Sequence, residues 1–345
     1  MKPFLYFILT ICILNAQGQV SLFDTIELQK LKKEISNSSI VGLGEVEHGF
    51  ESINEAKSTL LNMLQTELNF NAVAFESSFI ESIVSFLNND ALETRAKNFL
   101  YPFWNTTSVK TALKNLFDNE KSLLKPLIIG FDIQEDCRFQ KFSEYLISKR
   151  LITTNKDKLK DCDSILSSYI GKDFSRKGAI TNQEYLLLIH NYKEIAEEIK
   201  TKKFDALQKK LIERSIENRK WLCKYLTLSN VREKMYHRDS IMADNISWLK
   251  NELYSVNKLI IWAANTHIAK FTGNKKPTWT GEWLSSVYGD KYFTIAFQKG
   301  SGDKTFYLKN IYFNYSNNAN EKFNMVIYLD KLRKIKAQEW ITHCD

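Results

Sequence analysis

The chain has 345 residues, 44% of them apolar, and a formal net charge of +8. This length and apolar content are enough for a packed core in one large domain or two ordinary ones, which excludes a short peptide and a fully disordered chain. Lysines between residues 193 and 224 alternate with glutamates, which is typical of a solvated helix face. No tract interleaves basic and aromatic residues, so we expect no nucleic-acid partner.

Residues 1–18 are predicted to be a signal peptide. Lys2 precedes a nearly continuous apolar run from Phe4 to Leu14, and the small residues Ala16 and Gly18 stand at the spacing that signal peptidase prefers. The run is too short to span a bilayer, so we expect no stable membrane insertion after cleavage. A buried N-terminal strand is the alternative. We therefore expect an exported protein, periplasmic or secreted, with a single mature domain at 19–345.

Four cysteines remain after such a cleavage, and their spacing argues against a zinc site. They are Cys137, Cys162, Cys223 and Cys344. They lie far apart and form no C-x-x-C pair. Export makes disulfides possible, and one or two bridges could form, but the spacing does not pair them. We expect buried, unpaired thiols.

Four apolar runs along the chain are each followed by an acid, a histidine or both. The runs are 38–43, 71–75, 126–131 and 258–264. The polar residues that follow them are Glu45 and His48, then Glu76, then Asp132, and last Asn265 and His267. In open α/β sheets, ligands bind at the carboxyl ends of the strands. The repeated pattern therefore predicts a functional site at one edge of a sheet.

Helical patterns separate these strands and predict an α/β fold. Helices alternate with strands between about residues 50 and 121, and the block of about 139–254 is helical in pattern almost throughout. Further strands are expected at 292–298, 305–315 and 323–329. The alternation predicts a central, mainly parallel sheet flanked by helices. The helical block becomes a large insert between the third and fourth core strands.

Glu45 and His48 have the chemistry of a general base. They lie in a short turn between Gly44 and Gly49, where glycine gives the backbone freedom to aim both side chains at one place. A carboxylate beside an imidazole raises its basicity and selects one tautomer, which suits the activation of water. The alternative is a histidine that only caps the following helix.

A second imidazole and a second acid strengthen the case for an active site. His267 and Glu76 both follow strand-like runs, and a carboxylate buried at such a position needs a partner, or burial costs several kcal/mol. A neighbouring serine could satisfy Glu76, so a structural role stays open. Together, two histidines and several acids at strand ends predict a catalytic site.

Arg238 and Trp104 are the further residues that we expect near this site. Arg238 either pairs locally with Asp239 or reaches the site to bind a substrate carboxylate or a developing oxyanion. Trp104 could line a substrate pocket. No serine stands in a G-x-S-x-G turn, so a serine-hydrolase mechanism has no support.

Five segments, taken in order, resemble the erythromycin esterase family. Gly-Glu-Val-Glu-His-Gly at 44–49 resembles its GE-x-x-HG box, and 70–76 is similar to its second strand, which ends in Glu. Residues 129–132 look like its GxD strand, 237–245 like its RD-x-x-M-A-x-N helix, and 261–267 like its WAHNxH box. These segments cover nearly the whole mature chain.

The resemblance implies a metal-independent hydrolase without a cofactor. His48 would activate water against an ester or lactone, Glu45 and Glu76 would be its partners, and His267 would position water or stabilise the intermediate. The residues that we assign to substrate binding are Arg238, Lys57, Trp104, Asp132 and Asn265. The expected partner is a small-molecule substrate, and no oligomeric state follows from the sequence.

Two departures from the family pattern make erythromycin itself a poor candidate substrate. Ala264 stands where the family's WAHN box has its histidine, and Lys57 stands where macrolide-cleaving members carry arginine. Lysine does not reproduce the planar fork of arginine.

Two other functions stay open. Glu45, His48, Glu76 and His267 could bind zinc or manganese for metal-dependent hydrolysis, although their spacing forms no compact motif. The replacement at Ala264 also fits a non-catalytic binding protein that has kept the site and lost the chemistry.

Overall fold

The computed structural model describes residues 25–170, 178–271, 278–299, 307–308, 322–329 and 332–335. The expected signal peptide, Cys344 and most of the expected strand at 305–315 lie outside these residues. The chain divides into two compact units, 1–36 and 37–345. The described part of the first unit contains helix α2 (Thr25–Ile35), and the elements that follow belong to the second.

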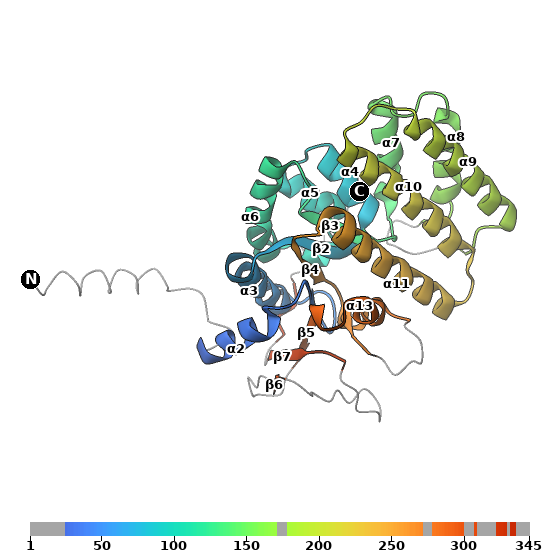
Figure 1. Cartoon of the computed structure of the whole chain (residues 1–345). Coiled ribbons are helices and arrows are strands. Elements are labelled where there is room, and N and C mark those ends of the chain that lie inside the picture. The colour runs from blue at the N-terminus through green and yellow to red at the C-terminus, as the bar shows by residue number, and fades with distance from the viewer. Residues whose placement is uncertain are drawn as a thin grey trace, which may run out of the picture. The chain divides into compact units, whose positions relative to one another are not determined.

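A seven-stranded sheet forms the centre of the second unit (Figure 1), in the order β3-β2-β4-β1-β5-β7-β6. The strands are β1 (Ile40–Leu43), β2 (Phe70–Ser78), β3 (Ile128–Asp132), β4 (Lys258–Trp262), β5 (Tyr292–Lys299), β6 (Tyr307–Leu308) and β7 (Met325–Leu329). Neighbouring strands pair in parallel except β6, which is antiparallel to β7. The first four strands in the chain are buried almost throughout, as expected for parallel strands covered on both faces.

Helices connect these strands as the sequence predicts. Helix α3 (Glu51–Leu68) follows β1, and the helices between β2 and β3 are α4 (Phe79–Leu87), α5 (Leu92–Phe99), η1 (Pro102–Trp104) and α6 (Thr107–Leu123). The elements between β4 and β5 are α12 (Asn265–Ile268), α13 (Thr280–Tyr288) and η4 (Gly289–Lys291). The predicted α/β class with a mainly parallel sheet is confirmed.

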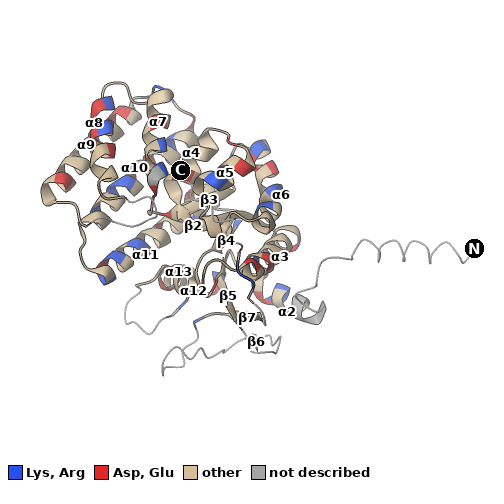
Figure 2. Cartoon of the chain, turned by 180° about the vertical axis from the view of Figure 1, so that it is seen from behind, with Lys and Arg blue, Asp and Glu red and all other residues tan. Residues whose placement is uncertain are grey.

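The large helical insert lies between β3 and β4. Its elements are η2 (Cys137–Gln140), α7 (Lys141–Ser148), α8 (Lys156–Ser167), α9 (Asn182–Lys200), α10 (Ala206–Thr227), α11 (Val231–Trp248) and η3 (Leu249–Leu253). Figures 1 and 2 show α7 to α10 gathered beyond the β3 edge of the sheet. Helix α11 instead returns to the sheet and packs on β3, and this brings its side chains to the strand ends.

Strand β2 continues two residues beyond the expected end at Glu76. Phe75 pairs with Gly130, but Ser78 pairs with Asp132, so three steps along β2 match two along β3. This is a β-bulge, which turns a side chain away from regular alternation and is common beside functional sites. The expectation that β2 ends at Glu76 missed the bulge, because hydrophobic pattern alone does not reveal an extra residue.

Two glycines are needed for space where the chain approaches itself closely. A Cβ at Gly130 would lie 2.2 Å from the carbonyl oxygen of Ser78 and 2.4 Å from that of Ser77. A Cβ at Gly44 would lie 2.1 Å from the Oδ1 atom of Asn265. Gly130 therefore permits the bulge in β2, and Gly44 permits α12 to close against the end of β1.

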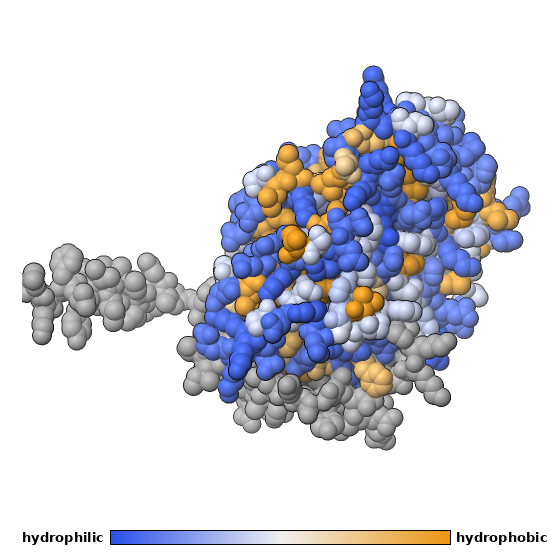
Figure 3. Space-filling view, viewed as in Figure 1, coloured by the Kyte–Doolittle hydropathy of each residue, from blue (hydrophilic) through white to orange (hydrophobic). Residues whose placement is uncertain are grey.

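Charges of both signs are mixed on the described helices of the insert. Basic and acidic residues lie side by side along the insert helices (Figure 2), and the face in Figure 3 is mostly hydrophilic with scattered apolar places. Within the described ranges, the helices lack a stretch with the length and apolar character that a membrane span requires.

Two of the four cysteines can be compared with the expectation of buried thiols. Cys162 and Cys223 are buried and free, which confirms the expectation for this pair. Burial raises the pKa of Cys162 to about 12, so that thiol is unreactive at neutral pH. The side chain of Cys137, like the whole of Cys344, lies outside the described part of the chain.

We expect Gly130→Ala to lower the free energy of unfolding by about 2 to 3 kcal/mol, because the new methyl group meets two backbone carbonyls that have little room to move. Gly42→Ala is the matched comparison, since its Cβ would meet only the Ile268 side chain and a tyrosine hydroxyl, at 3.2 to 3.3 Å. Urea denaturation of both variants tests this. Equal losses would contradict the proposed role of Gly130 at the bulge.

Candidate active site

The loop after β1 places Glu45 beside His48. The Nδ1 atom of His48 lies 2.5 Å from Oε1 of Glu45. The indole Nε1 of Trp104 donates to the same oxygen at 2.9 Å, and Nζ of Lys57 donates to Oε2 at 2.9 Å. The His48 ring stacks on Phe103 with centroids 4.4 Å apart. Glu45 is thus a buried carboxylate held by three donors, and only the histidine among them is substantially exposed, at 36% of its side chain.

Electrostatics favour an ionised Glu45 and a basic His48. Burial would raise the pKa of Glu45, but the Lys57 ammonium and the His48 hydrogen bond outweigh it, so the pKa is lowered. Burial would likewise lower the pKa of His48, but its hydrogen bond to Glu45 and the charges of Glu45 and Glu76 raise it. Burial lowers the pKa of Lys57 to about 8, against the opposing pull of Glu45.

Glu76 lies in the bulge of β2, and both of its carboxylate oxygens also have hydrogen-bonding partners. Its Oε1 accepts from Nη2 of Arg238 at 2.8 Å and lies 3.2 Å from Nε2 of His267. Its Oε2 accepts from the backbone N–H of Ala264 at 2.9 Å. Burial opposes its ionisation, but the charges of His267 and Arg238 hold the pKa of Glu76 well below its usual range.

Arg238 reaches the site from α11 and joins two strands. Its Nε and Nη2 donate to the carboxylate of Asp132 at 2.6 to 3.0 Å, while Nη2 also donates to Glu76. Asp132 accepts in addition from the backbone of Gln134 and, over 3.4 Å, from the hydroxyl of Tyr101. Of the two arrangements expected for Arg238, the structure contains the one that reaches the strand ends, and Arg238 binds protein carboxylates there.

Asp239, the next residue on α11, binds His267 instead of Arg238. Its Oδ1 lies 2.7 Å from Nδ1 of His267 and accepts from the backbone N–H and hydroxyl of Thr280 at 3.0 and 2.8 Å. His267 thus lies between two carboxylates, one at each ring nitrogen. Burial opposes its protonation, but Glu76 and Asp239 raise the pKa of His267 to about 10. At neutral pH, each ring nitrogen of His267 therefore carries a proton, one directed at Asp239 and the other at Glu76.

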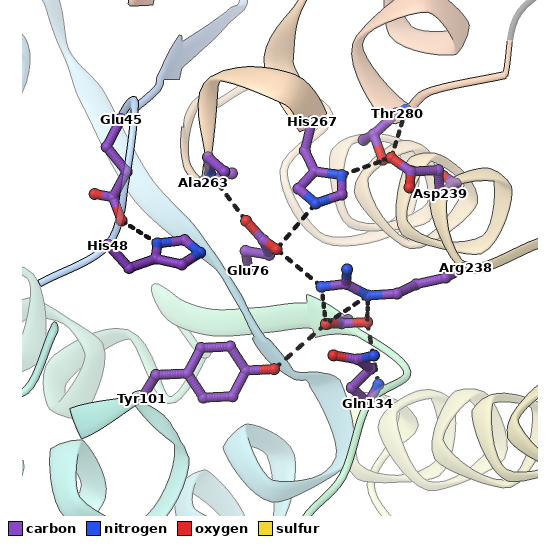
Figure 4. A network of polar contacts seen from close by, with 12 residues as sticks. Glu45, His48, Glu76, Tyr101, Gln134, Arg238, Asp239, Ala263, His267 and Thr280 are labelled. Atoms are coloured by element: carbon purple, nitrogen blue, oxygen red, sulfur yellow. Dashed lines mark hydrogen bonds and ion pairs between the residues drawn. The ribbon is translucent and has the colours of Figure 1, made fainter. Parts of the chain in front are cut away.

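Figure 4 shows two clusters side by side at the strand ends: the Glu45–His48 pair, and the contacts that join Glu76, His267, Asp239, Arg238 and Asp132. Together they form the polar network of the site. The structure brings together all four residues expected to be catalytic, which are Glu45, His48, Glu76 and His267, and it adds Arg238 and Asp132. The second ring nitrogen of His48 points away from Glu45 and toward the part of the network around Glu76 (Figure 4). The predicted convergence of separate strands is therefore present.

Three residues expected to bind substrate have other contacts. Lys57 and Trp104 are each 0% exposed, and both donate hydrogen bonds to the carboxylate of Glu45. The Lys57 ammonium also lies 4.4 Å from the centroid of the Trp262 ring. Asn265 donates from its side chain to the carbonyl of Phe297 on β5 at 3.0 Å. Lys57 and Trp104 thus hold the Glu45 carboxylate, and Asn265 holds the start of α12 against β5.

Sequence reasoning missed several residues that complete the network. Asp239 follows Arg238 on the same helix. Side chains of consecutive helix residues point in different directions, which could have suggested that the two residues have different partners. Tyr101 and Phe103 belong to an aromatic cluster before α6, which is a weak signal of a pocket wall. Thr280 gives no local signal, because its contact with Asp239 joins segments 41 residues apart.

A metal site finds little support in these contacts. Within the described ranges, no group of three or more His, Cys, Asp or Glu side chains is arranged to hold a metal ion. The oxygens of Glu45 and Glu76 already accept from ammonium, guanidinium, indole, imidazole or backbone donors. A cavity of about 720 Å³ lies elsewhere, between the ends of α4, α6 and α10, and no residue of the network lines it.

We expect His267 to stabilise the fold in a pH-dependent way. Its pKa in the folded protein, about 10, exceeds the ordinary value of 6.5. Its contribution is therefore fully present below pH 6.5 and is lost as the pH rises to about 10. The free energy of unfolding should differ between wild type and His267→Gln most at acidic pH, and this difference should shrink by about 2 kcal/mol or more toward pH 10.

Urea denaturation across this pH range measures the difference. Lys57 titrates in the same range in both proteins, so its effect largely cancels. His190→Gln is the control, because the His190 side chain is 65% exposed. A His267→Gln difference that stays constant with pH would contradict a doubly bound imidazolium.

Comparisons with known proteins agree with this architecture. The sequence profile described as "Erythromycin esterase" matches residues 66–311. YbfO of Bacillus subtilis (strain 168), whose name describes a hydrolase without a stated substrate, is 27% identical over a 306-residue alignment that covers 80% of this chain and 68% of YbfO. Erythromycin esterase type II of Escherichia coli is 22% identical over 306 residues, covering 80% of this chain and 72% of its own.

Solved structures share the fold. An erythromycin esterase mutant, EreC, in its open conformation matches with a TM-score of 0.62 at 17% identity, over 91% of this chain and 96% of EreC. A protein described as a succinoglycan biosynthesis protein matches with a TM-score of 0.61 at 20% identity, over 80% of this chain and 70% of its own. Since the family profile covers well over half of the sequence, the chain belongs to the erythromycin esterase family, a family of hydrolases.

Proposed function

We propose that this hydrolase cleaves an ester or lactone with a water molecule activated by His48. The observation that carries the proposal is the Glu45–His48 pair. One ring nitrogen of His48 is bound to a buried carboxylate at 2.5 Å, while the side chain remains 36% exposed and its second nitrogen faces the network (Figure 4). This is the arrangement that a general base requires, with one nitrogen fixed and the other available.

The reaction follows from this tautomer. With Nδ1–H donated to Glu45, the Nε2 lone pair of His48 takes a proton from water while the water oxygen attacks the carbonyl carbon. The tetrahedral intermediate then expels the alkoxide oxygen, which receives the proton from Nε2. An ester gives an acid and an alcohol, and a lactone gives one hydroxy acid. Glu45 stabilises the imidazolium that exists between the two transfers.

Arg238 is the donor best suited to the oxyanion. The N–H groups of Trp104 and Ala264 are already donated to Glu45 and Glu76. Arg238 uses Nε and Nη2 for Asp132 and Glu76, and its side chain remains 14% exposed. A preorganised donor in a partly buried site stabilises charge that develops in the transition state.

Two sets of residues act by positioning. Lys57 and Trp104 hold the oxygens of Glu45, so they are assigned to orienting the base and not to contacting substrate. Both ring nitrogens of His267 contact carboxylates, those of Asp239 and Glu76. We therefore assign His267 the role of a permanent cation that holds Glu76 in position. A role for His267 as a second base does not fit this pairing.

The wider setting is also a proposal. We infer that the mature chain, 19–345, acts after export and removal of residues 1–18, on a small-molecule ester or lactone other than erythromycin. The support is the apolar N-terminal run and the two family positions at Lys57 and Ala264. Metal-dependent hydrolysis and a non-catalytic binding role remain outcomes of the test below.

We expect His48→Asn to lower kcat by about a thousandfold on any ester or lactone that the wild type cleaves, because general-base catalysis contributes about 10² to 10⁴. His190→Asn is the matched control on an exposed helix. Hydrolysis is followed over a panel of p-nitrophenyl esters and lactones that includes erythromycin, before and after dialysis against a chelator. Wild-type rates in His48→Asn would sink the mechanism. Activity lost with a stoichiometric metal would favour the metal-dependent alternative.

We expect kcat/KM to rise with pH as His48 loses its proton, with a midpoint above 6.5. Burial lowers the pKa of His48, but Glu45 raises it by more than burial lowers it, so the net shift is upward. The positive charge of Lys57 lowers the pKa of His48. Lys57→Met should therefore move the midpoint to higher pH. Lys57→Arg keeps the positive charge and should move the midpoint less. A midpoint that falls in Lys57→Met would contradict this assignment.

A further inference from the structure

The cations of the site are all bound to carboxylates of the site itself. Lys57 binds Glu45, and Arg238 binds Asp132 and Glu76. His267 lies between Glu76 and Asp239. We infer that this site selects uncharged or positively charged substrates over anionic ones, and that Asp132 sets the preference by neutralising Arg238. The inference rests on the proposed hydrolysis at His48.

The charges of the network do not cancel completely. It contains four carboxylates, on Glu45, Glu76, Asp132 and Asp239, and three cations, on Lys57, Arg238 and His267. With His48 neutral, as a base must be, the sum is minus one. An anionic group that enters this network therefore meets net repulsion, which is strong where water is partly excluded.

The neighbouring buried pairs do not reverse this sum. Arg138 binds Asp136 at the end of β3 and lies 3.3 Å from Glu81. Burial raises the pKa of Glu81 well above its usual range despite the charge of Arg138, and ionisation of this carboxyl would only add negative charge. Arg219 binds Glu135 at 2.8 Å. Neither group supplies an excess of positive charge, so the negative sum of the site is not reversed.

Arg238 is the cation that a substrate is most able to reach. Its side chain is 14% exposed, against 9% for His267 and 0% for Lys57. Asp132 is buried and accepts hydrogen bonds from both Nε and Nη2 of Arg238. Two parallel contacts of this kind are the strongest form of Arg–carboxylate pairing. The remaining guanidinium edge suits charge that develops during reaction better than a charge already present.

Aromatic rings beside the two histidines act in the same direction. Phe103 stacks on His48, the ring of Trp279 lies edge-on to His267 with centroids 6.0 Å apart, and Tyr236 contacts Trp279. Aromatic faces carry partial negative charge and attract cations. These rings therefore favour an apolar or cationic substrate group over an anionic one.

The net charge of the whole chain does not oppose this selectivity. The formal charge of +8 is a sum over all 345 residues, and salt screens exposed charges that lie more than about 8 Å away at physiological ionic strength. Partly buried charges at contact distance are screened less. The overall charge affects encounter with anions, and the network decides which ligands remain bound.

The test measures binding separately from turnover. Calorimetry with the His48→Asn protein compares three p-nitrophenyl esters of similar size: pentanoate, which is uncharged, the glutarate monoester, which is anionic, and 4-(trimethylammonio)butanoate, which is cationic. We expect the anionic ester to bind about tenfold or more weakly than pentanoate, with the gap shrinking as salt is added. Equal binding of the two, or no binding by any of the three, would overturn the inference.

Asp132→Asn identifies the residue responsible. In the His48→Asn background it should reduce the gap between the anionic and uncharged esters about tenfold, because it releases Arg238. Asp136→Asn is the matched control, since Asp136 is equally buried but binds Arg138. A gap that persists in Asp132→Asn would remove Asp132 as the determinant, and should that variant fail to fold, the three-ester comparison still decides the charge preference.

Turnover of pentanoate by the wild type tests the proposed function independently. A charge preference in binding without turnover would overturn the esterase proposal and leave the binding preference in place. Turnover without a charge preference would do the reverse.

Discussion

The structure of this site depends on the burial of carboxylates at the carboxyl ends of parallel strands. An ionised carboxylate loses much of its hydration there, and the loss is tolerable only when hydrogen-bond donors and positive charge replace water. Glu45 and Glu76 are 2% and 3% exposed, and each is met by three donors. The lysine, arginine and histidines of the network can be understood as the groups that make these two buried acids possible.

The order of strands explains why distant segments supply those groups. Strand β4 lies between β2 and β1, so the segment after β4, which includes His267 on α12, lies between Glu76 and Glu45. The backbone of Ala264 in that loop binds Glu76, and the Ala263 carbonyl accepts from Lys57 at 3.4 Å. The long insert between β3 and β4 ends in α11, which brings Arg238 and Asp239 to the same edge. One strand order thus makes a single network from residues more than 200 positions apart.

Much of this could be predicted from sequence, for a physical reason. Parallel strands buried on both faces are continuous apolar runs, so the acids and histidines that follow them stand out, and a shared edge then implies convergence. What could not be predicted depends on which way a side chain turns. The bulge at Glu76 shifts register without changing hydrophobicity, Asp239 and Arg238 diverge although adjacent, and Lys57 lies on α3 where only the fold reveals that it binds Glu45. Thr280 contributes through a tertiary contact with no local pattern.

The two histidines show how environment alone separates identical side chains into different roles. Both have a carboxylate at Nδ1. His48 has this single partner, an aromatic ring against its face and contact with solvent, so its pKa is raised while its second nitrogen stays available. His267 has a second carboxylate at Nε2 and almost no exposure, so it holds both protons to a pKa of about 10. A proton acceptor is useful only if it can also release its proton near the working pH. By that criterion His48 can cycle, whereas His267 serves as a fixed charge that keeps Glu76 ionised and Arg238 in place.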